Sequence, residues 1–111
     1  MEEIRELPKS FVARGECRGF EFAQIADSKH GFIYEVTFNG GRHYEVFKKR
    51  VVQTFTINEE GERIITGKKY SYPTSKAFGD WAWTATSFAS AIARLDKIED
   101  NGESKKLREQ N

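Results

Sequence analysis

The clearest alternation of apolar and polar residues lies in the first half of the chain. Within residues 32–38 every second residue is large and apolar, and Glu35 and Thr37 fall between them. The apolar positions are Phe32, Tyr34, Val36 and Phe38. A period of two is typical of a β-strand with a buried face. The alternation around Phe20 and Phe22 predicts an earlier strand, separated from this one by the turn-forming residues 27–31.

Residues 39–41, Asn-Gly-Gly, predict a hairpin turn, because glycine readily adopts the positive φ that tight loops require. A three-residue loop is favoured here because it gathers apolar residues on one face. It places Phe38 opposite Arg42, Val36 opposite Tyr44 and Tyr34 opposite Val46. The alternative two-residue loop places Val36 opposite His43 and Tyr34 opposite Glu45. A slip of one residue exchanges the two faces of the strand.

The segment from Tyr44 to Ile57 is long for one strand and contains three consecutive basic residues at 48–50. A bend or bulge is therefore expected there. Residues 58–61 predict a second turn. Residues 64–72 predict a further strand that is broken at Gly67, and Pro73 ends this strand or marks it as a sheet edge.

The one strong helical pattern lies near the end of the chain. Its apolar stripe consists of Phe88, Ile92, Leu95 and Ile98. Thr86 or Ser87 is a suitable N-cap, and the Asn-Gly pair at 101–102 predicts the helix end. Residues 79–84 are interpreted as the last strand, whereas the alternative extends the helix back to Ser75.

Together these elements predict an α+β fold: an antiparallel β-meander of about four or five strands packed against one C-terminal helix that covers its apolar face. The expected organisation is an N-terminal arm at 1–10, a single domain at 11–100 and a disordered tail at 101–111.

Composition narrows the function classes. The 111 residues include 18 Lys and Arg against 17 Asp and Glu, so the net charge of +1 gives no global attraction to nucleic acid or anionic lipid. No apolar run approaches the roughly 18 residues of a membrane-spanning helix, and no signal peptide is apparent, so we expect a cytoplasmic protein without membrane contact. The lone Cys17 is expected to be an ordinary thiol.

Both tryptophans lie in the segment Phe78-Gly79-Asp80-Trp81-Ala82-Trp83. On an extended strand the two indoles would face one surface, whereas on a helix they would point apart. We assign Trp81 to the core and Trp83 to the surface, where indole is favoured in binding sites. The candidate partner-binding residues are Trp83, Trp81, Phe78, Tyr72 and Tyr70.

The stretch from Tyr72 to Trp83 resembles a segment of small uncharacterised proteins from bacteriophages and integrated mobile elements. In those proteins too, Tyr-Pro, Phe-Gly and Trp-Ala-Trp precede a closing helix. Residues 34–49 are loosely similar as well, so the resemblance covers about half of the chain. It brings no established activity. It implies a phage or mobile-element origin and a small accessory protein that modulates a host.

A basic stretch supplies an alternative. Residues 48–76 hold seven Lys and Arg against three Glu, with tyrosines among them. Basic side chains beside aromatic rings are typical of single-stranded nucleic-acid binding. The candidate residues are Lys48, Lys49, Arg50, Lys68 and Lys69. A simpler interpretation is an edge strand that lysines protect from aggregation.

A second alternative is a metal-binding or enzymatic sheet face. The favoured register places Glu35 opposite Glu45, with His43 beside them, and opposed carboxylates bind cations or raise one another's pKa. A solvated polar face explains the same residues more simply. The chain contains no zinc-ligand spacing, catalytic triad, P-loop or dinucleotide fingerprint.

We therefore expect a non-enzymatic protein that acts by binding a partner protein, either from a host or a second copy of itself. Neither a cofactor nor a metal is expected. The protein is expected to be a monomer or a dimer formed through an edge strand near residues 68–72.

Overall fold

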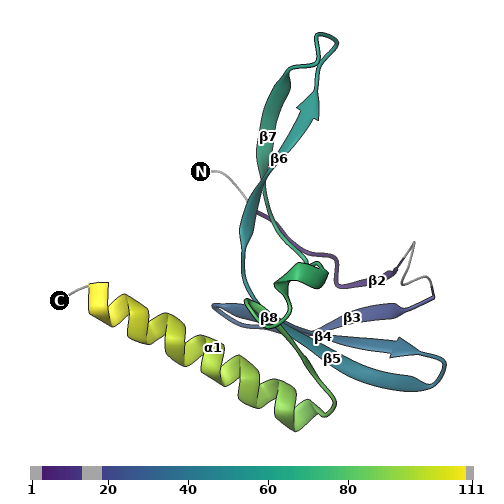
Figure 1. The fold of residues 1–111 in the computed structure, drawn as a ribbon, viewed down its shortest axis with the longest axis vertical. Coiled ribbons are helices and arrows are strands. Elements are labelled where there is room, and N and C mark those ends of the chain that lie inside the picture. Colours follow the sequence, from purple (N-terminus) through teal and green to yellow (C-terminus); the bar gives the residue numbers. More distant parts are fainter. Residues whose placement is uncertain (1–3, 14–18, 110–111) are drawn as a thin grey trace. The chain divides into compact units, whose positions relative to one another are not determined.

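The computed structural model describes residues 4–13 and 19–109 (Figure 1). The chain divides into two compact units, one formed by Pro8–Lys48 with Pro73–Asn111 and the other by Lys49–Tyr72 with Met1–Leu7. Cys17 lies outside the described residues, so its predicted environment stays a prediction. The domain bounds drawn from the sequence also stay predictions.

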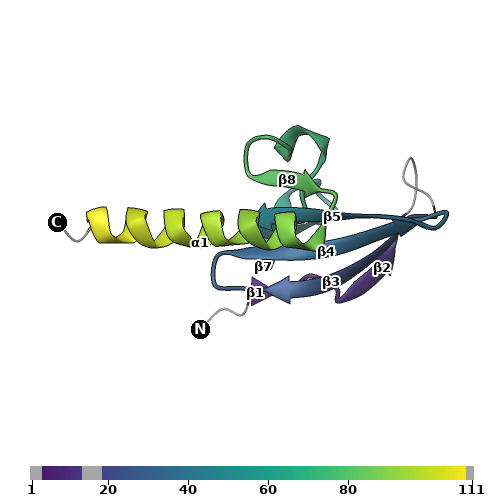
Figure 2. The same ribbon diagram turned by 90° about the horizontal axis from the view of Figure 1, so that it is seen from below.

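The larger unit contains a five-stranded antiparallel sheet and one long helix. The strand order is β2-β3-β4-β5-β8. The bounds are β2 (Ser10–Val12), β3 (Glu21–Asp27), β4 (Gly31–Phe38), β5 (Gly41–Lys48) and β8 (Ala82–Ala85). Helix α1 (Phe88–Glu109) packs against β4, β5 and β8, as Figure 2 shows from below. The predicted α+β meander with one C-terminal helix is confirmed.

Both faces of this sheet are apolar, which differs from the expectation of a single apolar face under the helix. The helix covers a cluster made by Ile33, Tyr44, Val46, Ala91, Leu95 and Ile98. The opposite face is aromatic: Phe11 stacks on Phe22 with ring centroids 4.6 Å apart, and Tyr34 stacks on Phe47 at 5.7 Å. Phe32 and Tyr34, expected under the helix, therefore face away from it.

The β4–β5 hairpin adopts the two-residue loop, so the favoured three-residue register is wrong. Val36 lies opposite His43 and Tyr34 opposite Glu45. Asn39 and Gly40 have φ of 49° and 79°, the pair of positive values that a type I′ turn needs to match the twist of its strands. Since both faces of β4 are buried, gathering the apolar residues on one face was not a valid criterion for the register.

The segment before the helix is a strand, as predicted, and the extended-helix alternative is wrong. A short 3-10 helix, η2 (Ser75–Ala77), precedes it. Gly79 has a φ of 92°, and its N–H donates to the Ala82 carbonyl at 2.8 Å. The chain loops round at this turn so that Phe78 and Ala82 form a parallel bridge, and Trp81 lies in the turn rather than in the strand.

Helix α1 begins as predicted but ends later. The Ser90 N–H donates to Ser87 Oγ at 3.1 Å, which is an N-cap hydrogen bond. The expected end at residues 101–102 is wrong, because the helix continues to Glu109. A glycine inside a helix costs only about 1 kcal/mol relative to alanine, and good helix formers follow it. The predicted disorder of residues 101–111 stays a prediction.

The helix docks closely because β4 begins with a glycine. A Cβ at Gly31 would lie 2.8 Å from Leu95 Cδ1 and 2.9 Å from the Phe47 carbonyl oxygen. Leu95 and Ile98 are buried there, whereas Phe88, the first residue of the predicted stripe, is 51% exposed. Ala91, which is not part of the predicted stripe, is instead fully buried in the cluster under the helix.

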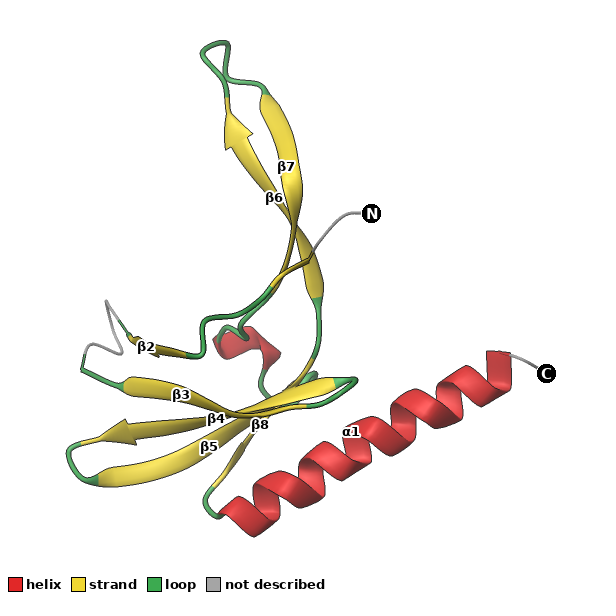
Figure 3. Ribbon diagram, turned by 180° about the vertical axis from the view of Figure 1, so that it is seen from behind, coloured by secondary structure: helices red, strands yellow, loops and turns green. Residues whose placement is uncertain are grey.

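The smaller unit is a three-stranded sheet with order β1-β7-β6 (Figure 3). The bounds are β1 (Ile4–Arg5), β6 (Val51–Ile57) and β7 (Arg63–Tyr70). The predicted second turn is confirmed: Asn58 Oδ1 accepts hydrogen bonds from the N–H groups of Glu60 and Glu62 at 3.0 and 2.8 Å. The predicted edge at Lys68 and Lys69 is wrong, because β7 pairs with β6 on one side and, in parallel, with β1 on the other.

Within the described residues, no helix is both long enough and apolar enough to cross a bilayer.

Candidate functional site

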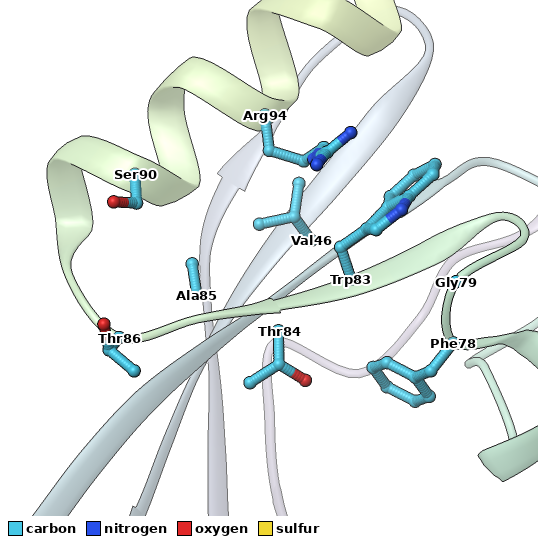
Figure 4. Close-up of a pocket in the computed structure, with 9 residues that line it drawn as sticks. All are labelled: Val46, Phe78, Gly79, Trp83, Thr84, Ala85, Thr86, Ser90 and Arg94. Carbon is cyan, nitrogen blue, oxygen red and sulfur yellow. The ribbon is translucent and has the colours of Figure 1, made fainter.

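A pocket of about 390 Å³ follows the outer edge of β8, between that strand and α1 (Figure 4). It belongs entirely to the larger unit. Its lining combines apolar side chains, hydroxyls and one cation: Val46, Phe78, Gly79, Trp83, Thr84, Ala85, Thr86, Ser90 and Arg94. Trp83 and Arg94 lie on one side of the strand and Thr84 on the other, as the alternation of side chains along a strand requires.

Trp83 is the largest side chain in this pocket, and two cations lie over its ring. Its position opposite Val46 directs the half-buried indole toward the core cluster under the helix. The Arg94 guanidinium carbon lies 4.7 Å from the ring centroid, and Lys48 Nζ lies 5.8 Å from it. Cations at such distances are attracted to the negative face of the indole. The ring therefore holds two positive charges beside the pocket.

No carboxylate among the described residues forms an ion pair with Arg94 or Lys48. Two ion pairs of the larger unit lie elsewhere, between Arg42 and Glu35 at 3.8 Å and between His43 and Glu45 at 3.5 Å. The positive charge at the pocket is therefore not neutralised by a direct ion pair within the described part of the chain. A guanidinium keeps its in-plane N–H donors available for a carboxylate even when its face lies on an aromatic ring.

The outer edge of β8 faces the pocket with main-chain groups. The Lys48 N–H donates to the Trp81 carbonyl at 2.9 Å, on the β5 side, whereas the Ala82 carbonyl accepts from Gly79 on the outer side. Because successive residues of a strand direct their N–H and C=O groups to alternate edges, those of Thr84 point outward like those of Ala82. β8 is the last strand of its sheet. Thr84 thus offers one donor and one acceptor that a further strand could pair with.

The structure brings together two of the five predicted partner-binding residues. Trp83 and Phe78 line the pocket. Trp81 does not, because its ring contacts Phe47 at a centroid distance of 6.4 Å on the sheet face away from the helix. Tyr70 and Tyr72 belong to the smaller unit. The two indoles therefore do not face one surface, as they would if both lay in one extended strand.

Sequence reasoning missed Arg94. The residue directly precedes Leu95 in the apolar stripe of the helix, and a long basic side chain at the border of such a stripe often lies along the surface of the packed element. That position at the border of the stripe was the sequence signal that could have identified Arg94. Which aromatic ring the guanidinium would meet depends on how the helix docks.

The predicted basic residues are divided between the two units. Lys48 belongs to the larger unit, and the other four residues belong to the smaller one. Lys68 and Lys69 are consecutive in β7 and so point to opposite faces of the hairpin. Lys49 Nζ lies 5.3 Å from the Tyr70 ring centroid, a cation–aromatic contact of the predicted kind.

The predicted pair of carboxylates does not form. In the observed register Glu35 lies opposite Tyr44, and Glu45 lies opposite Tyr34, so the two carboxylates project from opposite faces of the sheet. Among the described residues, no three or more His, Cys, Asp or Glu side chains gather closely enough to hold a metal ion.

Comparisons with protein-family models, curated proteins and solved structures find no match to this chain. The resemblance to phage and mobile-element proteins therefore stays a prediction.

Proposed function

We propose that this protein is a non-enzymatic binding module that holds an extended, acidic segment of a partner protein along the outer edge of β8. One observation carries the proposal: the open edge of β8 lies beside a tryptophan that holds two cations without an ion-paired carboxylate among the described residues. Main-chain pairing, an apolar surface and positive charge are then all available to one ligand.

Each feature of the pocket suits a different part of such a segment. The outward N–H and C=O of Thr84 suit main-chain pairing, which supplies affinity in β-strand addition. The ring of Trp83 suits an apolar side chain, and the guanidinium of Arg94 suits a carboxylate in a charge-assisted hydrogen bond. Alternate side chains of a bound strand would reach the two sides of β8, where Trp83 and Phe78 lie.

The biological setting rests on the resemblance alone. The resemblance implies an accessory protein of a phage or mobile element, and the partner in this proposal is therefore a host protein.

Single-stranded nucleic acid is the second candidate ligand, and the contact of Lys49 with Tyr70 favours it. A phosphate backbone would need several cations on one surface, and a base would need an open aromatic face. Arg94 already occupies one approach to the Trp83 ring, so the pocket suits a peptide better. Nucleic-acid binding would be recognised by a steep loss of affinity with rising salt.

The proposal is tested by selecting ligands from a displayed library of random linear peptides. The full chain should enrich peptides that combine acidic and apolar residues. The Arg94→Glu variant should lose this enrichment, while Lys97→Glu, an exposed charge reversal on the same helix, should keep it. Enrichment of basic peptides, or equal enrichment by both variants, would contradict the proposal.

A further inference from the structure

Strand β6 is an unusually unprotected sheet edge. It spans Val51–Ile57 and forms one edge of the smaller sheet. Its sequence, VVQTFTI, contains neither a charge nor a proline. Natural edge strands are normally short or carry charges and prolines that prevent pairing with another chain. The other edge strands of the described sheets are short, with two residues in β1, three in β2 and four in β8.

The hairpin that contains β6 has no core of its own. Every residue of Lys49–Tyr72 is exposed or only half-buried. Phe55, Ile57 and Ile65 are 47%, 59% and 50% exposed, respectively. Strands without a buried apolar face are marginally stable in water. Covering these side chains with another protein surface would supply the missing burial.

Apolar side chains gather on one face of this hairpin. Alternation places Val51, Phe55 and Ile57 on the same face of β6, and Ile65 lies directly opposite Phe55. The guanidinium of Arg63 covers the Phe55 ring at 4.2 Å from its centroid. A strand added beside β6 would extend this apolar face.

The free edge of β6 has a defined set of outward main-chain groups. The Arg50 carbonyl accepts from the Ser71 N–H at 2.9 Å, and the Asn58 N–H donates to the Glu62 carbonyl at 3.0 Å, so even-numbered residues pair toward β7. By alternation, the N–H and C=O groups of the odd-numbered residues, including Gln53 and Phe55, point outward.

Charge is separated along the hairpin. Its tip carries Glu59, Glu60 and Glu62 against one cation, Arg63, whereas its other end carries Lys49, Arg50, Lys68 and Lys69. Two hairpins lying antiparallel would place each acidic tip beside the basic end of the other. Parallel hairpins would place like charges together, which disfavours that arrangement.

We propose that two copies of this chain form a two-fold symmetric dimer in which their β6 strands pair antiparallel and join two three-stranded sheets into one. The register that overlaps the whole of Val51–Ile57 places Thr54 of both copies at the axis and Val51 opposite Ile57 of the second copy. Gln53 then exchanges main-chain hydrogen bonds with Phe55 of the second copy. Such a self-complementary patch is what a two-fold interface requires. This surface shares no residue with the β8 pocket, so either proposal can fail without the other.

Removing one outward N–H tests the pairing. We expect sedimentation velocity of the full chain to show a monomer–dimer equilibrium across micromolar concentrations. Gln53→Pro removes a donor that faces away from β7, and it should weaken the dimer by about tenfold or more through lost hydrogen bonds and the ring clash. Gln53→Ala, which keeps the N–H, is the matched control. A chain that stays monomeric throughout, or a dimer that tolerates Gln53→Pro, would overturn the proposal.

Charge exchange tests the antiparallel orientation, and it does not depend on a proline that could disturb the hairpin. One variant carries Glu59→Lys and Glu60→Lys, and the other carries Lys49→Glu and Arg50→Glu. Each variant alone should dimerise more weakly than the original chain, because the exchanged charges remove the attraction between the tip of one copy and the base of the other. Mixing the two should restore dimerisation, since each tip then meets an opposite charge. Undiminished dimerisation of either variant alone, or no recovery on mixing, would contradict the antiparallel dimer.

Discussion

The guanidinium carbon of Arg94 lies 4.7 Å from the centroid of the Trp83 ring, and this contact joins helix α1 to the last strand of the larger sheet. It fixes a positive charge at the pocket along the outer edge of β8. It also covers part of an indole that would otherwise be more accessible to water. The contact therefore links the packing of the helix with the charge that the proposed ligand would meet.

Removing this guanidinium should expose Trp83. In a Trp81→Phe background, where Trp83 is the only indole, Arg94→Ala should increase acrylamide quenching and shift the emission to the red. The stability lost should be about 0.5–1 kcal/mol, as for a partly exposed cation–aromatic contact. Lys97→Ala, on an exposed part of the same helix, should change neither property. Unchanged quenching in Arg94→Ala would show that the guanidinium does not shield the ring.

The two-residue turn of the β4–β5 hairpin gives a prediction about glycine. Gly40→Ala should destabilise the protein by about 1 kcal/mol, because an L-residue is strained at positive φ. A Cβ there would meet no atom within 4 Å, so the cost would come from the backbone alone. Asn39→Gly should be close to neutral in the same urea titration. A neutral Gly40→Ala would contradict the observed turn.

The docking of helix α1 depends on Leu95 far more than on Phe88. Leu95 is 8% exposed, so Leu95→Ala should cost about 2–4 kcal/mol through lost burial and a cavity. Phe88→Ala should cost less than about 1.5 kcal/mol, because this ring is half exposed and contacts Tyr44 only at its edge. Thermal and urea unfolding of the two variants measure the difference. Equal costs would show that the apolar stripe begins at Phe88, as the sequence pattern predicts.

The buried hydroxyl of Tyr34 connects three segments of the chain through hydrogen bonds. It donates to the Pro8 carbonyl at 2.7 Å and accepts from Gln24 Nε2 at 3.0 Å. Tyr34→Phe should therefore cost about 1–2 kcal/mol, because it leaves both partners without this hydrogen bond. Tyr44→Phe is the control, since the Tyr44 hydroxyl makes no hydrogen bond to the described residues. Similar unfolding free energies for the two variants would contradict this role.

Local signals in the sequence predicted most of the elements. The N-cap at Thr86 or Ser87 and the turn at residues 58–61 each depend on a few neighbouring residues, and both were predicted correctly. The last strand was also predicted, at residues 79–84, and the structure places it at Ala82–Ala85. The hairpin register was not predicted, because it requires knowing that both faces of β4 are buried. The basic residues at 48–50 predict a bend in the segment from Tyr44 to Ile57, but they do not reveal that β5 and β6 belong to different sheets.

The candidate site was predicted only in part for the same reason. Trp83 and Phe78 could be selected as aromatic residues beside a strand end. Arg94 could not be placed next to Trp83, because the rotation of the helix on the sheet depends on the close approach of Leu95 to Gly31. Gly31 is far from Arg94 in the sequence, and Leu95 lies on another face of the helix. The separation of Trp81 from Trp83 depends on the turn at Gly79, which no period-two pattern shows.

The most direct test of the proposed function is a titration of the isotope-labelled full chain with two synthetic peptides, followed by NMR. One peptide alternates Glu and Val, and the other alternates Lys and Val. Binding along the edge of β8 predicts that the acidic peptide alone shifts the indole N–H of Trp83, the backbone N–H of Thr84 and the Nε–H of Arg94. Arg94→Glu should abolish these shifts. Shifts elsewhere, or equal shifts with the basic peptide, would contradict the account.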